Sequence, residues 1–393
     1  MIREIDLNTL YKRAQKKMET NVSECPIKMP NSYIIKLTTD CNLRCQYCYM
    51  GDSIHSQNMM SNELFEHILN QIKDNNSKFT VYLHGGEPCL RLDLILQLKS
   101  WIEQNHLNDF VNIMLQTNGT IVNQDIIRII KDMNIHVGVS IDGIYCDTNR
   151  ARVYENNQST VENVIKNIEL FLSENIRVGI FSVLTAYNAN SMLDFIKYFG
   201  GIGVRDFVIN PLVLWGNAKN KSELTATPQQ VYECYKQIID WLGDYNLNCG
   251  ADQRITERNL HWWFQGLTTG TKGYMCNCSP CGAGIQTIAI STTGDVYICD
   301  QYYGDDKFLI GNIGNTDLKD VMRNAQTTID GLRNIYNIET CKHCIWRYVC
   351  CGGCSATSYY YYGNMNSVAP NCEAYKKIFS YLDIRSQQKN IVL

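Results

Sequence analysis

The chain has 393 residues, of which 45% are hydrophobic and 19% are charged. This composition is typical of an ordinary folded protein and excludes a large disordered share. The formal net charge of −3 gives no electrostatic reason to expect a nucleic-acid or anionic-membrane partner. A chain of this length exceeds one comfortable hydrophobic core, so we expect two or three structural units.

No stretch of about 18 apolar residues is present, so we expect no membrane-spanning helix. The start of the chain is polar and mixed in charge, which excludes the apolar core of a signal peptide. We therefore expect a cytoplasmic protein. Its 18 cysteines are then unusual, because a cysteine-rich chain in a reducing compartment more often binds metal than builds disulfides.

Most of the cysteines fall into three groups, within residues 41–48, 276–299 and 341–372. Such grouping favours metal binding as the role of these thiols. The scattered cysteines are expected to be small buried hydrophobes; they are Cys25, Cys89, Cys146, Cys234 and Cys249.

From about residue 33 to 210, short apolar β-branched runs alternate with longer helical patterns. The expected strands are Tyr33–Thr39, Thr80–His84, Asn112–Thr117, His136–Ile141, Arg177–Leu184 and Asp206–Asn210. The expected helices are Glu63–Asp74, Asp93–Gln104, Gln124–Asp132, Val161–Glu174 and Ser191–Phe199. This alternation predicts an α/β fold with a parallel sheet, and six such units predict a partial TIM-like barrel.

Four motifs follow successive predicted strands. Cys41 comes after the first strand, the Gly-Gly-Glu-Pro run at 85–88 after the second, Asn118 after the third and Asp142 after the fourth. Function gathers at the C-terminal ends of the strands in such a barrel. We therefore expect these four motifs to lie on one face of the protein.

The rest of the chain predicts a different organisation. Pro228–Tyr245 has the pattern of an amphipathic helix, and Glu373–Gln387 is also expected to be helical. From Cys276 onward glycines, turns and cysteines dominate, as in a small unit held together by metal. We therefore divide the chain into an N-terminal extension (1–32), a partial barrel (33–225), a helical bridge (226–275) and a cysteine-rich unit (276–393).

The first cysteine group has the spacing C-x3-C-x2-C, with Cys41, Cys45 and Cys48. Three closely spaced thiolates in one loop suit a [4Fe–4S] cluster, in which three irons take thiolates and the fourth stays open to a substrate. The alternative is a zinc site, which takes four protein ligands and would need His55 as the fourth.

This spacing, with the aromatic Tyr47 just before the last cysteine, resembles the signature of the radical S-adenosylmethionine (SAM) superfamily. The resemblance implies that the open iron binds the amino and carboxylate groups of SAM. Glycines let backbone approach a ligand closely, and a glutamate offers an acceptor to an ammonium. The cofactor contacts that the resemblance implies are Tyr47, Gly85, Gly86, Glu87, Pro88, Asn118, Ser140, Asp142 and Arg150. For Ser140 and Arg150 the alternatives are a solvated strand end and a surface charge.

The later cysteines follow a second pattern, in which Cys281-x12-Gly294-x4-Cys299 precedes a C-x2-C-x5-C-x3-C run and a final cysteine. A zinc ribbon is the alternative, but the thiols outnumber the ligands of one zinc site and histidine is scarce. The pattern resembles the SPASM extension of radical SAM enzymes, which implies two auxiliary [4Fe–4S] clusters.

The same resemblance implies the ligands of both auxiliary clusters. One cluster would use Cys281, Cys299 and Cys354 with an upstream cysteine, which is Cys276 or Cys278. The upstream ligand could also be missing, which would leave one iron open to a substrate thiolate. The other cluster would use Cys341, Cys344, Cys350 and Cys372. Cys351 is expected to be a bystander.

Together the resemblances imply an enzyme that cleaves SAM reductively to a 5′-deoxyadenosyl radical and oxidises a peptide. Asp300, directly after Cys299, matches the position of the base in the anaerobic sulfatase-maturing enzymes; a surface turn aspartate is the alternative. One expected function is maturation of a ribosomally made peptide by a thioether or carbon–carbon cross-link or a related oxidation. The other is conversion of a cysteine or serine to formylglycine.

The expected partners are a peptide or protein substrate and a flavodoxin or ferredoxin reductant. A leader-binding winged helix does not fit into the 32 residues before the barrel, so a separate leader-binding protein is a further expectation. A hypothesis of another class is a non-catalytic electron-transfer or zinc-binding protein. It would need neither the Gly-Gly-Glu-Pro loop nor a barrel.

Overall fold

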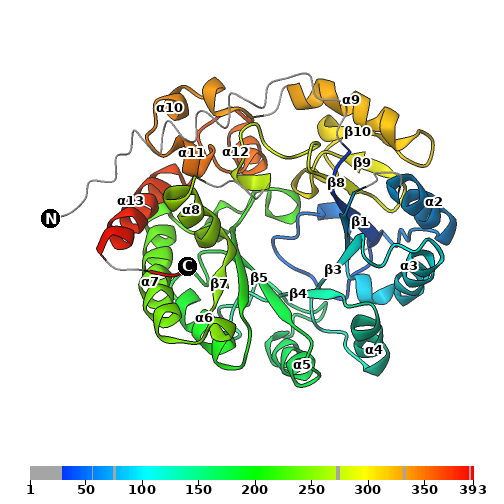
Figure 1. Cartoon of the computed structure of the whole chain (residues 1–393), viewed down its shortest axis with the longest axis horizontal. Helices are drawn as coiled ribbons and strands as arrows, with labels where there is room; N and C mark the ends of the chain where they lie inside the picture. Colours follow the sequence, from blue (N-terminus) through cyan, green and yellow to red (C-terminus); the bar gives the residue numbers. More distant parts are fainter. Residues whose placement is uncertain (1–28, 55, 74–76, 271–274, 331–332, 389–390) are drawn as a thin grey trace.

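The computed structural model describes residues 29–54, 56–73, 77–270, 275–330, 333–388 and 391–393. The predictions for Cys25, His55 and most of the N-terminal extension lie outside the described residues. A ten-stranded sheet runs through the molecule in the order β10-β9-β8-β1-β2-β3-β4-β5-β6-β7. Figure 1 shows this sheet curving around a central axis, with helices on its outside.

The six strands that the sequence predicts are neighbours in this sheet: β1 (Ser32–Thr38), β2 (Phe79–Gly85), β3 (Val111–Thr117), β4 (His136–Ser140), β5 (Val178–Leu184) and β6 (Asp206–Pro211). All five pairings among them are parallel, which confirms the α/β partial barrel. On β1, Tyr33, Ile35 and Leu37 are completely buried toward the helices. Because side chains alternate in a strand, Ile34 and Lys36 face the barrel interior.

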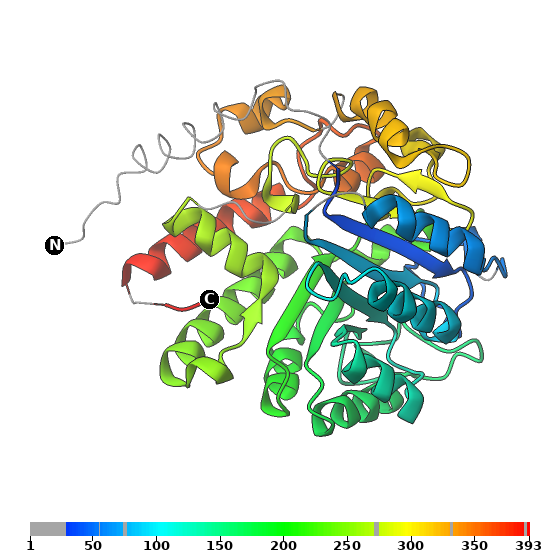
Figure 2. The ribbon, with the colours of Figure 1, turned by 45° about the vertical axis from the view of Figure 1, so that its right-hand side comes forward.

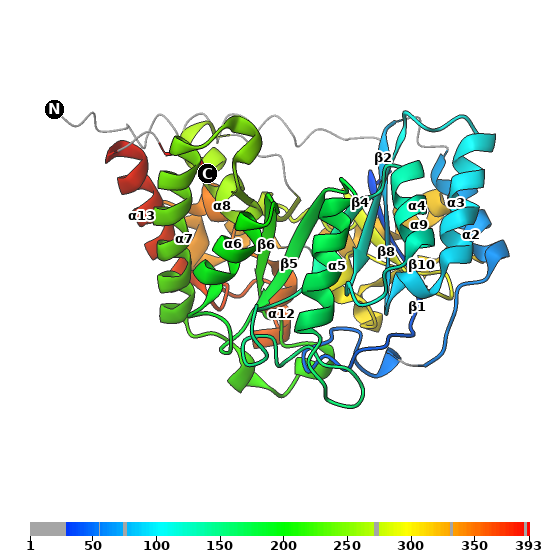
Figure 3. The ribbon, with the colours of Figure 1, turned by 90° about the horizontal axis from the view of Figure 1, so that it is seen from below.

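Five helices connect these strands: α2 (Asn62–Ile72), α3 (Leu92–Gln104), α4 (Gln124–Asp132), α5 (Val161–Ser173) and α6 (Met192–Gly201). Figure 3 shows them along the outer face of the sheet. In α4 the four isoleucines at 126, 127, 129 and 130 are buried, and the Asn123 side chain caps the helix by accepting a hydrogen bond from the N–H of Ile126. An apolar face of this kind fixes each helix against the sheet.

The sheet extends beyond the strands that the sequence predicts. β7 (Thr256–Glu257), within the predicted helical bridge, pairs in parallel with β6. β8 (Thr287–Ile290), within the cysteine-rich unit, pairs in parallel with β1, and β9 (Asp295–Tyr297) and β10 (Leu309–Asn312) follow antiparallel. These strands have only two to four residues, too few for a hydrophobic period to reveal.

The later helices are α7 (Pro228–Asn248), α8 (Arg258–Thr268), α9 (Leu318–Asp330), α10 (Glu339–Lys342), α11 (Arg347–Cys350), α12 (Ser355–Tyr362) and α13 (Cys372–Gln388). Figures 1 and 2 show α9 to α13 on the side of the barrel between the two edge strands of the sheet, β10 and β7. On α8, the Trp263 ring packs 5.4 Å from the rings of both Tyr375 and Phe379 of α13. Among the described helices, none is long and apolar enough to cross a membrane.

Glu257 joins β7 to the start of α8 and makes the stability of the fold depend on pH. Its buried carboxylate accepts hydrogen bonds from the backbone N–H groups of Ile209 (3.0 Å) and Leu260 (2.9 Å). Burial outweighs these bonds and raises the pKa of Glu257 to about 7. The contribution of this group to stability is therefore fully present below its unfolded pKa of about 4.3, and it is lost as the pH rises through about 7.

We expect the free energy of unfolding to fall by a few kcal/mol as the pH rises through this window. Glu257→Gln removes the titrating group, so urea unfolding of this variant at several pH values should give a shallower slope. The variant should also be less stable overall, because its amide NH₂ meets N–H donors. Glu169→Gln, at an exposed position of α5, is the control and should keep the wild-type slope. An equally steep slope for Glu257→Gln would contradict the assignment.

Candidate active site

The loop after β1 carries Cys41, Cys45 and Cys48 at the C-terminal end of the barrel. The loops after β1 and β6 gather at this end (Figure 3). The N–H of Asn217, after β6, donates to the Cys48 carbonyl at 2.9 Å, which anchors one loop to the other. Burial raises the pKa of Cys41 to about 12 and that of Cys48 to about 11. Because a bound cation is what stabilises buried thiolates, this set of donors fits a metal cluster.

The loop after β2 presses against the loop after β1. Gly85 has a φ of +136°, a conformation that side chains rarely adopt. A Cβ atom on Gly86 would collide with the backbone carbonyl of Asp40. Pro88 then starts the short 3₁₀ helix Pro88–Leu90. Both glycines are thus required for the close approach that the sequence predicts at this loop.

Glu87 fastens the end of β2 to the end of β3. Its completely buried carboxylate accepts hydrogen bonds from the Thr117 hydroxyl (2.7 Å), the N–H of Asn118 (2.7 Å) and the N–H of Cys89 (3.0 Å). Burial raises the pKa of Glu87, although these three hydrogen bonds act to lower it. Three donors of the chain already bind this carboxylate. In this structure Glu87 therefore holds the loop in shape. A direct contact of Glu87 with SAM stays a prediction.

Asn118 and Ser140 lie at the same end of the barrel. The Asn118 amide donates to the side chain of Asn42 at 2.9 Å, and its nitrogen lies 3.7 Å from the sulfur of Cys41. Ser140, the last residue of β4, accepts a hydrogen bond from the Gln116 amide at 2.8 Å. The structure therefore brings Asn118 directly beside the first cysteine group and places Ser140 in the barrel interior.

Tyr47 and Asp142, both predicted cofactor contacts, meet each other. The Tyr47 hydroxyl donates to Asp142 and accepts a hydrogen bond from Arg152 at 3.0 Å. Arg152 is buried, whereas the predicted clamp Arg150 is exposed and stacks 3.5 Å from the ring centroid of Tyr187. The buried arginine of this site is thus Arg152, which is not among the residues predicted from the sequence. No spacing distinguishes it from Arg150 in Arg-Ala-Arg.

Lys36 is completely buried in the barrel interior and is the centre of a polar cluster. Its ammonium forms an ion pair with Asp300, donates to the Tyr49 hydroxyl and lies 3.4 Å from Nδ1 of His84. Burial opposes ionisation of Asp300, but Lys36 prevails and holds the pKa of that carboxyl below its ordinary value. Burial, reinforced by Lys36, lowers the pKa of His84 to about 4, so the imidazole is neutral near pH 7.

Two members of this polar cluster are sequence neighbours of predicted cluster ligands. Tyr49 directly follows Cys48, and Asp300 directly follows Cys299. Lys36 therefore connects the loop of the first cysteine group to a loop of the later group. Asp300 was predicted from the sequence as a site residue, but Lys36 was not, because it lies within an otherwise apolar strand pattern.

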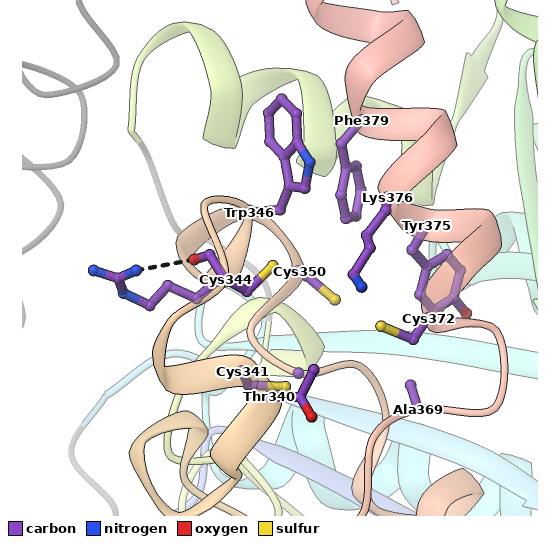
Figure 4. Close-up of a pocket in the computed structure, with 12 residues that line it drawn as sticks. Thr340, Cys341, Cys344, Trp346, Cys350, Ala369, Cys372, Tyr375, Lys376 and Phe379 are labelled. Atoms are coloured by element: carbon purple, nitrogen blue, oxygen red, sulfur yellow. Dashed lines mark hydrogen bonds between the residues drawn. The ribbon is translucent and has the colours of Figure 1, made fainter.

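Four of the later cysteines surround one cavity (Figure 4). Cys341 lies on α10, Cys344 follows it, Cys350 ends α11 and Cys372 begins α13. Burial raises the pKa of Cys341, Cys350 and Cys372. The structure thus brings together the four residues predicted to bind one auxiliary cluster.

The other predicted ligands also come together. The pKa of Cys299 is raised by burial first, and then by the neighbouring thiols of Cys276 and Cys281. The pKa of Cys281 is likewise raised by burial and by Cys354. The sulfur of Cys278 instead lies 3.9 Å from the side-chain nitrogen of Gln286, which donates to it. This arrangement favours Cys276 as the upstream ligand.

Cys351, the expected bystander, donates its S–H to the carbonyl of Asn277 at 3.0 Å. Within the described part of the chain, no three His, Cys, Asp or Glu side chains converge tightly enough for a single metal ion.

Family comparisons agree with this geometry. Residues 35–199 match the Radical SAM superfamily, and residues 281–345 match SPASM, an iron–sulfur cluster-binding domain. The chain belongs to the radical SAM superfamily. A SPASM domain follows the barrel in the chain, as the resemblance of the later cysteine pattern implies.

Relatives of this radical SAM protein cover most of its length. A cysteine-type anaerobic sulfatase-maturating enzyme of Clostridium perfringens is 27% identical over 379 residues, 90% of this chain and 96% of the relative. The structure of anSMEcpe with bound AdoMet has a TM-score of 0.80 at 24% identity and covers 93% of this chain and 96% of its own. Streptococcus suis SuiB bound to the precursor peptide SuiA has a TM-score of 0.67 at 17% identity, covering 92% and 79%.

These matches confirm three predictions, namely the radical SAM barrel, the SPASM domain and an enzyme with SAM and iron–sulfur cofactors. At such identities the solved structures establish the fold of this radical SAM protein. The individual ligands and contacts, and the domain boundaries, remain predictions.

Proposed function

We propose that this radical SAM protein oxidises a side chain of a peptide or protein substrate and that Asp300 accepts the proton released. The observation that carries the proposal is the ion pair between the completely buried Lys36 and the partly buried Asp300, whose side chain is 13% exposed, in the barrel interior between the loops of Cys48 and Cys299. A surface turn aspartate, the alternative for Asp300, would have neither this burial nor this partner.

The cofactor groups would be held by three sets of thiols. The SAM-binding cluster would use Cys41, Cys45 and Cys48, and the auxiliary clusters would use Cys276, Cys281, Cys299 and Cys354, and Cys341, Cys344, Cys350 and Cys372. When bound, these groups supply the 5′-deoxyadenosyl radical that removes a hydrogen atom from the substrate, and an acceptor for one further electron.

The protein positions the substrate, shields the site from water and supplies a base. Loss of a hydrogen atom and an electron leaves the substrate with a proton to release, and we assign the Asp300 carboxylate, whose pKa is lowered, as the acceptor of this proton. Lys36 stabilises that carboxylate and holds it in the barrel. His84, next to Lys36, is neutral near pH 7 and so adds no second positive charge to this cluster. In an interior shielded from water, a radical is protected from side reactions.

Two substrate classes fit. The sulfatase-maturating relative is similar along nearly all of both chains, which supports conversion of a cysteine or serine to formylglycine. The likeness to SuiB with its precursor peptide supports maturation of a ribosomally made peptide. For a cysteine, removal of two hydrogen equivalents gives a thioaldehyde, and water converts it to the aldehyde with release of hydrogen sulfide.

The decisive experiment is anaerobic incubation of the reconstituted protein with SAM, a reductant and a sulfatase-site peptide, followed by mass spectrometry. An aldehyde at the cysteine or serine would identify the first substrate class. An unmodified peptide, together with slow formation of 5′-deoxyadenosine, would direct the search to small precursor peptides. Absence of 5′-deoxyadenosine under all conditions would contradict the enzyme function itself.

The reconstituted protein should contain about twelve iron and about twelve sulfide atoms per chain, as three [4Fe–4S] clusters require. Joint replacement of Cys41, Cys45, Cys48, Cys341 and Cys344 by alanine should lower both counts to about four, because one cluster site is left. Replacement of the bystander Cys351 should leave them unchanged. Stoichiometric zinc in the wild type would contradict this assignment.

Two further partners are proposed because the family resemblance implies them. We propose a flavodoxin or ferredoxin as the source of electrons, and a separate leader-binding protein if the substrate is a precursor peptide. A cytoplasmic location is proposed because the described cysteines form no disulfide and the cofactors require reducing conditions.

A further inference from the structure

Arg333 is a buried cation in the cysteine-rich unit. It lies just before the 3₁₀ helix Ile335–Asn337, and only 2% of its surface is exposed. An arginine keeps its charge in proteins. A buried charge is costly unless an opposite charge or a metal site compensates it. The fold must therefore place a negative group near Arg333.

The hydrogen bonds of Arg333 do not supply this negative group. Its Nη1 donates to the Ser358 hydroxyl and, at 2.8 Å, to the carbonyl of Met365, and its Nη2 donates to the carbonyl of Gly352. All three acceptors are neutral. The buried Nε–H has no hydrogen-bond partner among the described residues. In that same part of the chain, no carboxylate forms an ion pair with Arg333.

The groups around Arg333 belong to both of the later cysteine sets. Gly352 lies in the short linker between Cys350 and Cys354, and these two cysteines are assigned to different clusters. A Cβ atom on Gly352 would lie 2.9 Å from Nε of Arg333. The N–H of Cys281, which is assigned to the same cluster as Cys354, donates to the backbone carbonyl of Arg333 at 3.3 Å. The linker between the two cluster sites thus packs directly on the guanidinium.

The thiols of both sets act on the charge of Arg333. Burial lowers the pKa of Arg333, and the thiols of Cys341, Cys350 and Cys354 act to raise it. The first two belong to one proposed cluster site and the third to the other. Burial raises the pKa of Cys281, and Arg333 acts against this rise. One guanidinium is thus within electrostatic reach of both sets of thiols.

Two other cations, Lys376 and Arg347, lie near the later thiols. Both line the cavity of the four thiols labelled in Figure 4. Lys376 forms an ion pair with Glu373 at 3.0 Å, so its charge is balanced. Arg347 donates to the carbonyl of Cys344 at 2.9 Å. These two cations therefore lie at one cluster site, whereas Arg333 lies against the linker between the two sites.

We infer that Arg333 is the counter-charge shared by the two auxiliary clusters and that it raises the reduction potential of each. The potential of a [4Fe–4S] cluster depends on the net charge around it and on hydrogen bonds to its sulfurs. A buried cation and an N–H donor without a partner in the chain both favour the more negative, reduced form. Arg333 is thus a positioning residue that makes the clusters better acceptors for the electron that leaves the substrate. The inference rests on the auxiliary clusters of the proposed function.

The test is a potentiometric titration of the reconstituted full chain, followed by electron paramagnetic resonance. The signal of the SAM-binding cluster is the one that changes when SAM is added, and it is the internal reference. Arg333→Met removes the charge and keeps a side chain of similar length. At a fixed potential, the ratio of reduced to oxidised protein should fall about tenfold at both auxiliary clusters, which corresponds to about 59 mV for one electron. The reference cluster should keep its potential.

Arg333→Lys should keep most of both potentials, because the charge remains although the planar fork of donors is lost. The control is Arg128→Met, at an exposed arginine of α4, which should leave every potential unchanged.

A matched pair of variants at the buried Ser358 leaves Arg333 itself in place. In Ser358→Asp a carboxylate meets the guanidinium, so both auxiliary potentials should fall. Ser358→Asn has nearly the same size without the charge and should stay close to the wild type. The pair tests whether charge at this position is felt by both clusters, even if Arg333→Met loses its clusters.

Four results would overturn the inference: wild-type potentials in Arg333→Met, a shift confined to one auxiliary cluster, an equal loss in Arg333→Lys, or equal potentials in the two Ser358 variants. A merely structural arginine would give the third result, since lysine lacks the fork of donors. Absence of two auxiliary signals in the wild type would contradict the cluster assignment as well.

The outcome is separable from that of the proposed function, because the potentials are measured without a peptide. Shifted potentials without oxidation of any peptide by the wild type would sustain the role of Arg333 and count against the function. Oxidation of a peptide by the wild type, with unshifted potentials in Arg333→Met, would do the reverse.

Discussion

Asp300→Asn should lower oxidation of the peptide by about 10²- to 10⁴-fold, the usual contribution of a general base, while SAM cleavage continues. Asparagine keeps the size of the side chain and an oxygen for Tyr49, but its amide cannot accept a proton at neutral pH. Radical formation needs only the cofactor end of the barrel, so 5′-deoxyadenosine should still accumulate. Product and 5′-deoxyadenosine are measured by mass spectrometry in the same sample.

The ratio of the two products is the quantity that tests Asp300. A merely structural aspartate would, when replaced, lower both products together, whereas a missing base uncouples them. Asp132→Asn is the control, because Asp132 pairs with Lys99 at 3.1 Å on the exposed surface of the barrel. A wild-type ratio of peptide product to 5′-deoxyadenosine in Asp300→Asn would rule out the proton transfer.

Lys36→Met should also uncouple the two products, through its effect on Asp300. Methionine fills a similar volume and removes the charge, so burial of Asp300 is no longer opposed by an ammonium. The pKa of Asp300 should rise, since burial is the largest influence on it and acts in that direction. At neutral pH more of the carboxyl is protonated, and oxidation should fall by about tenfold or more.

The loss of activity in Lys36→Met should depend on pH. Raising the pH should deprotonate Asp300 again and recover part of the activity of Lys36→Met, while Lys36→Arg should keep most of it near pH 7. The double variant with Asp300→Asn should be no worse than Asp300→Asn alone, because both changes act on one group. Lys99→Met, from the exposed pair with Asp132, is the matched control. A loss that is independent of pH and additive with Asp300→Asn would contradict the coupling.

Much of the barrel could be predicted from local sequence. Each of the six strands β1 to β6 is an apolar run of five to seven residues, and each is followed by a helix with its own period, so the two signals reinforce each other. The short strand β7 and the strands after Cys276 were missed. They exist because the edges of the barrel sheet offer unpaired backbone groups, and no pattern within the short segments records that.

The candidate site also contains residues that the sequence predicts and residues that only the fold identifies. The cysteines of the first group lie close together in the sequence, so their spacing alone suggests a shared metal. Arg150 and Arg152 are equivalent by composition, and only the packing of the loop after β4 puts Arg152 against Tyr47 and leaves Arg150 on Tyr187. Burial is a property of the folded loop, and the sequence carries no separate signal for it.

By itself the sequence determined the first cluster site, because its three thiolates come from one loop and therefore have a fixed spacing. It also determined the barrel, because strand and helix periods are local. Only the tertiary structure decided which distant groups meet. Lys36 and Asp300 are separated by more than half of the chain, and so are the strands β1 and β8, which pair with each other. Such contacts depend on the register and direction of whole elements, which no short segment specifies.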